Sequence, residues 1–252
     1  MQENRESTKV GLIGCGAIAK LIAEAVERKL VICDELVLYD QVTEKAETLK
    51  SALHFPAKVV SGIEEMLMLK PKVIVEAASQ QAVREYAERI ATEGVDLIVM
   101  STGALLDLNL QSSKIHVPAG AIGGLDALSS AALAGIAEVV FISRKNPRAF
   151  EMNNKEAQVV YEGTAEEAAR LYPRKMNVAA TLALTVKPAK VRVQVISDPE
   201  VQRNTHEFRV KWQFGEMFLR FANDPHPENP RTSALAAWSA IKLLQTLLLN
   251  SN

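Results

Sequence analysis

Three small residues near the N-terminus have the spacing of a dinucleotide-binding turn. Gly14, Gly16 and Ala19 follow a short apolar run and match the pattern G-x-G-x-x-G/A. The first glycine permits a sharp turn, and the second has no side chain, so a pyrophosphate can approach the backbone. The N-terminus of the following helix would present unpaired N–H groups to that phosphate. We therefore expect Gly14, Gly16, Ala17 and Ile18 to contact a nicotinamide dinucleotide.

Asp40 also suits this ligand. It follows the predicted strand 35–39, roughly 20 residues past the glycine turn, where an acid hydrogen-bonds the adenosine ribose. Its negative charge would repel a 2′-phosphate and favours NAD over NADP, although Gln41 and Thr43 could still accommodate a phosphate. The alternative is a tight strand–helix turn without a ligand and a solvated Asp40.

Two further predicted strands, 72–77 and 95–100, end in small and polar residues. Near-continuous apolar runs of this kind are typical of buried parallel strands. Because ligands bind at the carboxyl ends of such strands, the residues at these ends are candidate cofactor contacts. Turn chemistry and helix capping are the alternatives. The residues at these ends include Glu76, Ala78, Ser79, Ser101 and Thr102.

The middle of the chain holds two more candidate cofactor contacts. Ala121 lies in the small-residue segment 119–124, which indicates a backbone that passes close to a flat group such as a nicotinamide. A glycine-rich turn that opens the predicted helix 125–137 is the alternative. Asn177 begins another predicted helix, where its amide could reach a ligand or cap the helix.

His206 is the best candidate for proton transfer. An imidazole titrates near neutrality, and this one lies in the predicted strand 204–213 beside Asn204 and Thr205. From its position alone, a purely structural histidine stays an open alternative. The chain's four histidines are scattered and lack metal-ligand spacing, so we expect no metal site.

Composition limits the possible partners. The 252 residues include 29 basic and 30 acidic side chains, a net charge of −1 that does not indicate a nucleic acid or a membrane surface. No apolar run reaches about 18 residues, and the polar N-terminus lacks the apolar core of a signal peptide. Two cysteines fit a reducing compartment. We therefore expect a cytoplasmic protein without nucleic-acid or membrane partners.

The order of predicted elements indicates two α/β domains. Strands alternate with helices through residues 1–119, which predicts a Rossmann-type, doubly wound parallel sheet that binds NAD(P). From Glu138 the pattern changes, and we predict that residues 120–231 form a catalytic and dimerisation domain with an open mixed sheet. The apolar helix 232–250 should pack back on the first domain or help form a subunit interface. Two such domains imply hydride transfer in the cleft between them.

Three details of the second domain are specific enough to test. Residues 190–196 alternate charge and valine, the period-two pattern of a half-buried antiparallel strand. Residues 145–155 are expected to form a polar loop, and 223–231 a proline-rich loop.

Beyond these patterns, the sequence resembles the archaeal and bacterial L-aspartate dehydrogenase family. The motifs span most of the chain in the right order, and AGAIGGLDA and YEGTAEEAARLYPRKMNVAAT are far more specific than the glycine turn. The other segments that carry the resemblance are GLIGCGAIA, EAASQQAV, DLIVMSTGA, RKNPRAF, NTHE and ENPRTS.

The resemblance implies a dimer that oxidatively deaminates L-aspartate with NAD or NADP, or runs the reverse reductive amination. Its product would be iminoaspartate, which hydrolyses to oxaloacetate and ammonia or feeds NAD synthesis. Carried over to this sequence, the family's catalytic histidine falls on His206, and its nicotinamide contacts fall on Ala121 and Asn177. The donors for the substrate carboxylates are not assigned.

One departure and two alternatives accompany this interpretation. The segment 104–118 is shorter than in the family by about ten residues, so either a helix is truncated or residues are missing. A reductase of the dihydrodipicolinate type is one alternative, but its paired histidines with a downstream lysine are absent. A non-catalytic NAD-binding regulator is the other, and it predicts cofactor binding without turnover.

Overall fold

The computed structural model describes residues 7–108, 110, 112–173, 175–226 and 229–249, with only the backbone of residues 225, 226 and 229–232. The chain divides into two compact units. The first unit comprises Met1–Ser101, Leu110–Pro118 and Ala237–Asn252, and the second comprises Thr102–Asn109 and Ala119–Ala236.

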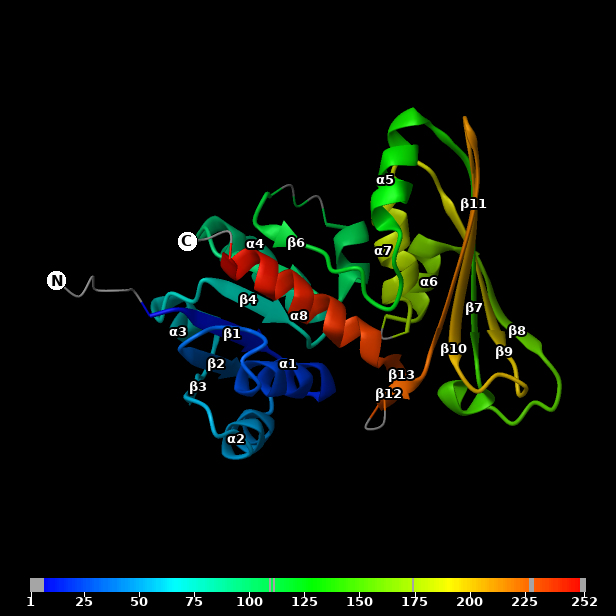
Figure 1. Ribbon diagram of the computed structural model, residues 1–252. Helices are drawn as coiled ribbons and strands as arrows, with labels where there is room; N and C mark the ends of the chain where they lie inside the picture. The colour runs from blue at the N-terminus through cyan, green and yellow to red at the C-terminus, as the bar shows by residue number, and fades with distance from the viewer. Residues whose placement is uncertain (1–6, 109, 111, 174, 227–228, 250–252) are drawn as a thin grey trace. The chain divides into compact units, whose positions relative to one another are not determined.

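The first unit is built on a six-stranded parallel sheet with the order β3-β2-β1-β4-β5-β6 (Figure 1). Its strands are β1 (Lys9–Ile13), β2 (Glu35–Tyr39), β3 (Ala57–Val59), β4 (Val73–Glu76), β5 (Asp96–Val99) and β6 (Ile115–His116). β1 pairs in parallel with β2 on one side and with β4 on the other. The strand order therefore reverses beside β1, where such sheets bind their ligands. The predicted doubly wound sheet is confirmed.

Helices follow the first four strands of this sheet. They are α1 (Ala17–Glu27), α2 (Thr43–Ser51), α3 (Ile63–Met68) and α4 (Gln80–Thr92). The apolar residues of α1, among them Ile22 and Val26, recur at helical spacing and are buried. All four residues of β4 are buried as well, as expected for a parallel strand covered on both faces.

The last helix, α8 (Ala234–Leu249), belongs almost entirely to the first unit by its contacts. The Gln245 side chain donates a hydrogen bond to the Leu30 carbonyl. The Arg28 guanidinium lies 6.0 Å from the centre of the Trp238 ring. Among the described residues, every helix is too short or too polar to cross a lipid bilayer.

The short segment 104–118 holds little regular structure. A 3₁₀ helix, η1 (Thr102–Leu106), leads into it, and the two-residue strand β6 lies near its end. The described residues between them form no α-helix. β6 nevertheless pairs in parallel with β5, so this edge of the sheet is complete without a helical crossover.

The second unit contains a five-stranded sheet with the order β11-β10-β7-β9-β8. Its strands are β7 (Ile136–Lys145), β8 (Gln158–Thr164), β9 (Val191–Ser197), β10 (Asn204–Trp212) and β11 (Gly215–Asn223). Three of its pairs are antiparallel, whereas β7 and β9 run parallel. The predicted mixed sheet is confirmed.

The expected direction of residues 190–196 was only half right. β9 is antiparallel to β8 but parallel to β7, because it lies inside the sheet between them. Its valines are buried and Arg192 is exposed, since only one face of the strand is covered. The period-two pattern reports that covered face and carries no information on strand direction.

Helices cover one face of this second sheet (Figure 1). They are α5 (Leu125–Ala134), α6 (Ala165–Leu171) and α7 (Asn177–Thr185). The core between helices and sheet includes Phe141, Leu182, Val193 and Phe208. Residues 223–231, expected as a loop, contain the short paired strands β12 (Pro225–His226) and β13 (Asn229–Ser233).

Candidate active site

The two glycines of the turn after β1 have different surroundings. Gly14 has φ +87°, and a Cβ atom there would lie 2.8 Å from the Ala77 carbonyl oxygen and from Ala78 Cα. Only glycine fits this turn without strain. A Cβ on Gly16 would meet nothing within 4 Å, and α1 starts at the next residue without a side-chain cap. The space beside Gly16 and the start of α1 suit a pyrophosphate.

Asp40 holds this turn in place. Its Oδ2 accepts a hydrogen bond from the Cys15 N–H at 2.8 Å, and its Oδ1 accepts one from the Val42 N–H at 2.9 Å. The carboxylate is thus more than a solvated surface charge. Burial, with a contribution from Asp40, raises the pKa of the Cys15 thiol to about 12, so this cysteine is neutral and unreactive at pH 7.

Glu76, at the end of β4, joins two of the strand ends expected to line the cofactor site. Its carboxylate accepts hydrogen bonds from the N–H groups of Ala78, Ser79 and Ser101 at 2.8, 2.9 and 3.0 Å. The Ser101 hydroxyl donates another, at 2.9 Å. Burial raises the pKa of Glu76, while these bonds favour the charged form and oppose the rise. Glu76 therefore positions the backbone of both loops.

The polar side chains at these strand ends also have structural partners. The Ser79 hydroxyl accepts from the Ala82 N–H at 3.2 Å and caps α4, the alternative left open from the sequence. The Thr102 hydroxyl donates to the Asn177 carbonyl at 2.8 Å and accepts from the Thr181 hydroxyl at 3.1 Å. As cofactor contacts, these residues stay predictions.

Ala121 and Asn177 lie in the second unit. Ala121 is buried, and its carbonyl accepts a hydrogen bond from the Asn223 side-chain amide at 2.9 Å. The glycines around it do form a turn that opens α5, with Gly124 at φ +72°. Asn177 is the first residue of α7, but Met176 occupies the N-cap position and the Asn177 Oδ1 accepts no hydrogen bond from the part of the chain that the structure describes. Its amide oxygen therefore does not cap the helix.

His206 lies in β10, opposite Ser143 of β7, and is 4% exposed. Its ring stacks on Phe141, with the ring centres 5.6 Å apart and the planes at 28°. Burial, and secondarily the charge of Lys145, lowers the pKa of His206 to about 3. The imidazole is therefore neutral at pH 7 and is available as a proton acceptor.

Three buried side-chain atoms have no hydrogen-bond partner among the described residues. They are Asn177 Oδ1, Asn204 Nδ2 and His206 Nδ1, and all belong to the second unit. Leaving a buried polar atom unsatisfied costs about 1–3 kcal/mol. Two of the three residues, Asn177 and His206, are candidate site residues from the sequence, and a ligand bound there could supply the missing partners.

Lys145 is the residue near this group that the sequence did not single out. It was expected in a polar loop, but it ends β7 and is 8% exposed. Burial, and secondarily the charge of Lys175, lowers the pKa of Lys145 to about 8. The signal that could have found it is its position two residues after Ser143, in the alternation that buries Val139 and Phe141.

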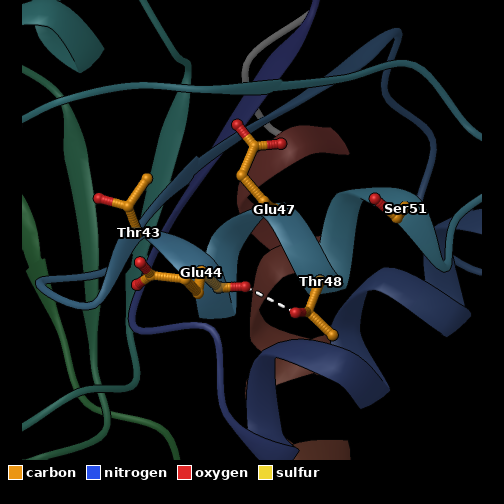
Figure 2. A pocket seen from close by; sticks show the side chains of 5 residues that line it. All are labelled: Thr43, Glu44, Glu47, Thr48 and Ser51. Carbon is orange, nitrogen blue, oxygen red and sulfur yellow. Dashed lines mark hydrogen bonds between the residues drawn. The ribbon is translucent and has the colours of Figure 1, made fainter.

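The hollow beside α2 is a poor ligand site by comparison. Figure 2 shows its lining, which consists of Thr43, Glu44, Glu47, Thr48 and Ser51. The Thr48 hydroxyl donates to the Glu44 carbonyl at 2.6 Å within the same helix. The two carboxylates would repel a phosphate or a dicarboxylate, so the hollow is not part of the candidate site.

The buried imidazole should make stability depend on pH. Its pKa is about 3 in the folded protein and 6.5 in the unfolded chain, so between these pH values the unfolded state binds more protons than the folded state. The free energy of unfolding therefore decreases as the pH is lowered through this range. Between pH 7 and pH 5 we expect the wild type to lose about 2 kcal/mol more unfolding free energy than His206→Asn. Urea titrations at both pH values measure this, and equal losses would contradict a neutral buried imidazole.

Two different family models match the part of the chain with the parallel sheet and the part with the mixed sheet. The family model "Homoserine dehydrogenase, NAD binding domain" matches residues 14–117, and "Aspartate dehydrogenase, C-terminal" matches residues 126–247. The crystal structure of aspartate dehydrogenase from Thermotoga maritima superposes with a TM-score of 0.75 at 28% identity, covering 96% of this chain and 97% of that chain.

Two relatives share higher sequence identity with this chain than the Thermotoga maritima protein does. The L-aspartate dehydrogenase of Archaeoglobus fulgidus is 43% identical over 94% of this chain and 97% of its own length. That of Methanothermobacter thermautotrophicus is 42% identical over 94% of this chain and 95% of its own length. Because identity this high extends over nearly the full length of both partners, the chain belongs to the L-aspartate dehydrogenase family.

Proposed function

We propose that this protein oxidatively deaminates L-aspartate with NAD or NADP to iminoaspartate, which hydrolyses to oxaloacetate and ammonia, or catalyses the reverse reductive amination. The observation that carries the proposal is the likeness, along nearly the whole of both chains, to relatives named L-aspartate dehydrogenase. The buried polar atoms of Asn177, Asn204 and His206 that lack partners among the described residues support it independently.

The first unit's residues fit a dinucleotide. The open space at Gly16 and the uncapped start of α1 suit a pyrophosphate, and Asp40 directly follows β2, the strand next to the turn. When bound, the nicotinamide supplies an acceptor for the Cα hydride of the substrate. The residues we assign to cofactor binding are Gly14, Gly16, Ala17, Ile18, Asp40, Ala78, Ser79, Ser101, Thr102, Ala121 and Asn177.

His206 would move the proton. The α-amino group must be neutral before its carbon can become an imine carbon, and a neutral imidazole can accept the ammonium proton. After this proton has been released to solvent, the same imidazole can accept a proton from the water that attacks the imine. Its low pKa keeps it in the accepting form at pH 7, and a substrate carboxylate bound nearby would raise that pKa towards a useful range.

The direct test is the rise in nicotinamide absorbance when the protein is mixed with cofactor and an amino acid. We expect kcat/KM for L-aspartate to exceed that for L-asparagine, which lacks one carboxylate charge, by at least about 100-fold. D-aspartate and L-glutamate complete the panel. Titration with both cofactors should give tighter binding of NAD than NADP, because Asp40 would repel a 2′-phosphate. Cofactor binding without turnover of any amino acid would favour a regulator instead.

Two finer assignments are part of the same proposal. The family resemblance supports a homodimer. A cytoplasmic location is supported by the cysteines, which are both free in the described structure and so suit a reducing compartment.

A further inference from the structure

Asn204 is one of the three residues with a buried polar atom that lacks a partner, and the sequence assigns it no role. It is the first residue of β10 and is 3% exposed. Its side-chain N–H₂ donates to no acceptor in the part of the chain that the structure describes. Leaving a buried donor unsatisfied is unfavourable, so its presence points to an acceptor that a ligand brings.

Strand geometry places Asn204 beside His206. Side chains two residues apart on a strand point to the same face, with their Cβ atoms about 7 Å apart. Phe208 and Val210 continue the buried alternation of β10 and belong to the core under the helices. The His206 ring stacks on Phe141 of the same core. The Asn204 amide and the His206 imidazole therefore lie next to each other on the helix-covered face of the sheet.

The neighbouring strand β11 links Asn204 to the segment that contains Ala121. Asn204 lies directly opposite Asn223, and directly opposed residues of antiparallel strands share a face. The Asn223 amide donates to the Ala121 carbonyl at 2.9 Å. Ala121 is the position that the family resemblance assigns to a nicotinamide contact. Asn204 thus lies between the candidate base on its own strand and the residue that holds Ala121 on the next.

We propose that the Asn204 amide binds a carboxylate of the dicarboxylic substrate and so positions the α-amino group relative to His206. This inference rests on the proposed function for the identity of the substrate. L-aspartate in its ammonium form has two carboxylates that accept hydrogen bonds, whereas its ammonium group only donates them. A carboxylate is therefore the part of the substrate that can satisfy the Asn204 N–H₂. A hydrogen bond from an amide to a carboxylate is charge-assisted, and such bonds are about twice as strong as neutral ones.

The test is Asn204→Leu, which keeps the branched shape of the side chain and removes its donor. We expect KM for L-aspartate to rise about tenfold or more, with a smaller change in kcat, because the lost bond already exists in the bound substrate. The dissociation constant of succinate, a dicarboxylate without an amino group, should rise by a similar factor in the presence of NAD. Affinity for NAD itself should change by less than about twofold, since the acceptor belongs to the substrate.

Stability separates substrate binding from a structural role. Removing a hydrogen bond within a folded protein normally lowers its stability. Because the Asn204 N–H₂ makes none in the described part of the chain, the urea midpoint of Asn204→Leu should be unchanged or higher. Succinate added with NAD should raise the midpoint of the wild type and should not raise that of the variant at the same concentration.

Asn154→Leu is the matched control. The Asn154 Nδ2 donates to the carbonyls of Glu156 and Ser197 at 2.7 and 3.1 Å, and its Oδ1 accepts from the Ser197 hydroxyl at 2.7 Å. The same substitution there should lower the urea midpoint and leave KM and the succinate affinity of the folded protein unchanged. Circular dichroism identifies a variant that has failed to fold, and Asn204→Ala then provides the same test as Asn204→Leu.

The outcomes separate the two proposals. Turnover of L-aspartate with unchanged KM and succinate affinity in both Asn204 variants would overturn the subsite and leave the proposed function standing. Loss of NAD affinity with unchanged succinate affinity would assign the amide to the cofactor and overturn the subsite as well. Succinate binding that depends on Asn204, without turnover of L-aspartate, would support the subsite and overturn the proposed function. A wild type that neither binds succinate nor turns over L-aspartate would overturn both.

Discussion

Replacing His206 with alanine is expected to lower kcat for L-aspartate oxidation about 1,000-fold. The variant loses the only side chain that we assign to proton transfer, and the loss falls on the chemical step. The side chain stacks on Phe141 and is not among the residues that we assign to cofactor binding, so the NAD affinity should be kept. Steady-state kinetics and a separate NAD titration measure the two effects.

The control for this variant is His54→Ala. His54 is an exposed histidine just after α2, in the first unit, and its removal should leave kcat unchanged. Added imidazole should restore part of the activity of His206→Ala if the missing group acts as a base, because the deleted ring leaves a space of its own size. Full activity in His206→Ala would show that another group moves the proton.

Two alanine substitutions in the glycine turn should affect different properties, Gly14→Ala mainly the stability of the fold and Gly16→Ala mainly the affinity for NAD. Gly14→Ala places a methyl group at φ +87° against the Ala77 carbonyl, and we expect it to lower the unfolding free energy by about 3 kcal/mol. Gly16→Ala meets no neighbour and should change that free energy by less than about 1 kcal/mol. It should nevertheless weaken NAD binding at least about tenfold, because the methyl group occupies the approach of the pyrophosphate.

Denaturant unfolding and NAD titration of both variants distinguish the roles of the two glycines. A stable Gly16→Ala variant that binds NAD as tightly as the wild type would mean that no ligand approaches the backbone there. A Gly14→Ala variant of unchanged stability would mean that the turn has another conformation. Either result would remove support for a dinucleotide at the start of α1.

Much of the fold could be predicted because local pattern determined it. Buried parallel strands such as β4 read as continuous apolar runs, and glycine or a capping residue marks the helix ends. The direction of β9 could not be predicted in the same way. Its alternation reflects one covered face, whereas its direction is set by its partners β7 and β8, which both lie earlier in the chain and are separated from it by α6 and α7.

The residues of the candidate site likewise include some that local sequence pattern predicts and some that it does not. Gly14, Gly16 and Asp40 were found because their spacing has a known physical use. Lys145 was not found, because a charged residue at the end of a strand was taken as the start of a polar loop, although the alternation that buries Val139 and Phe141 extends to it. The role of Glu76 was likewise hidden, since two of its hydrogen bonds come from Ser101, 25 residues further along the chain.

The contribution of α8 to the first unit has a consequence for synthesis. The parallel sheet of that unit is complete once residue 118 has been made, yet Ala240, Ile241 and Leu244 of α8 are buried in the same unit and emerge from the ribosome only after the second unit. During translation of the second unit, the nascent first unit therefore carries an uncovered apolar surface. That interval is when the polypeptide is most prone to self-association and most in need of a chaperone.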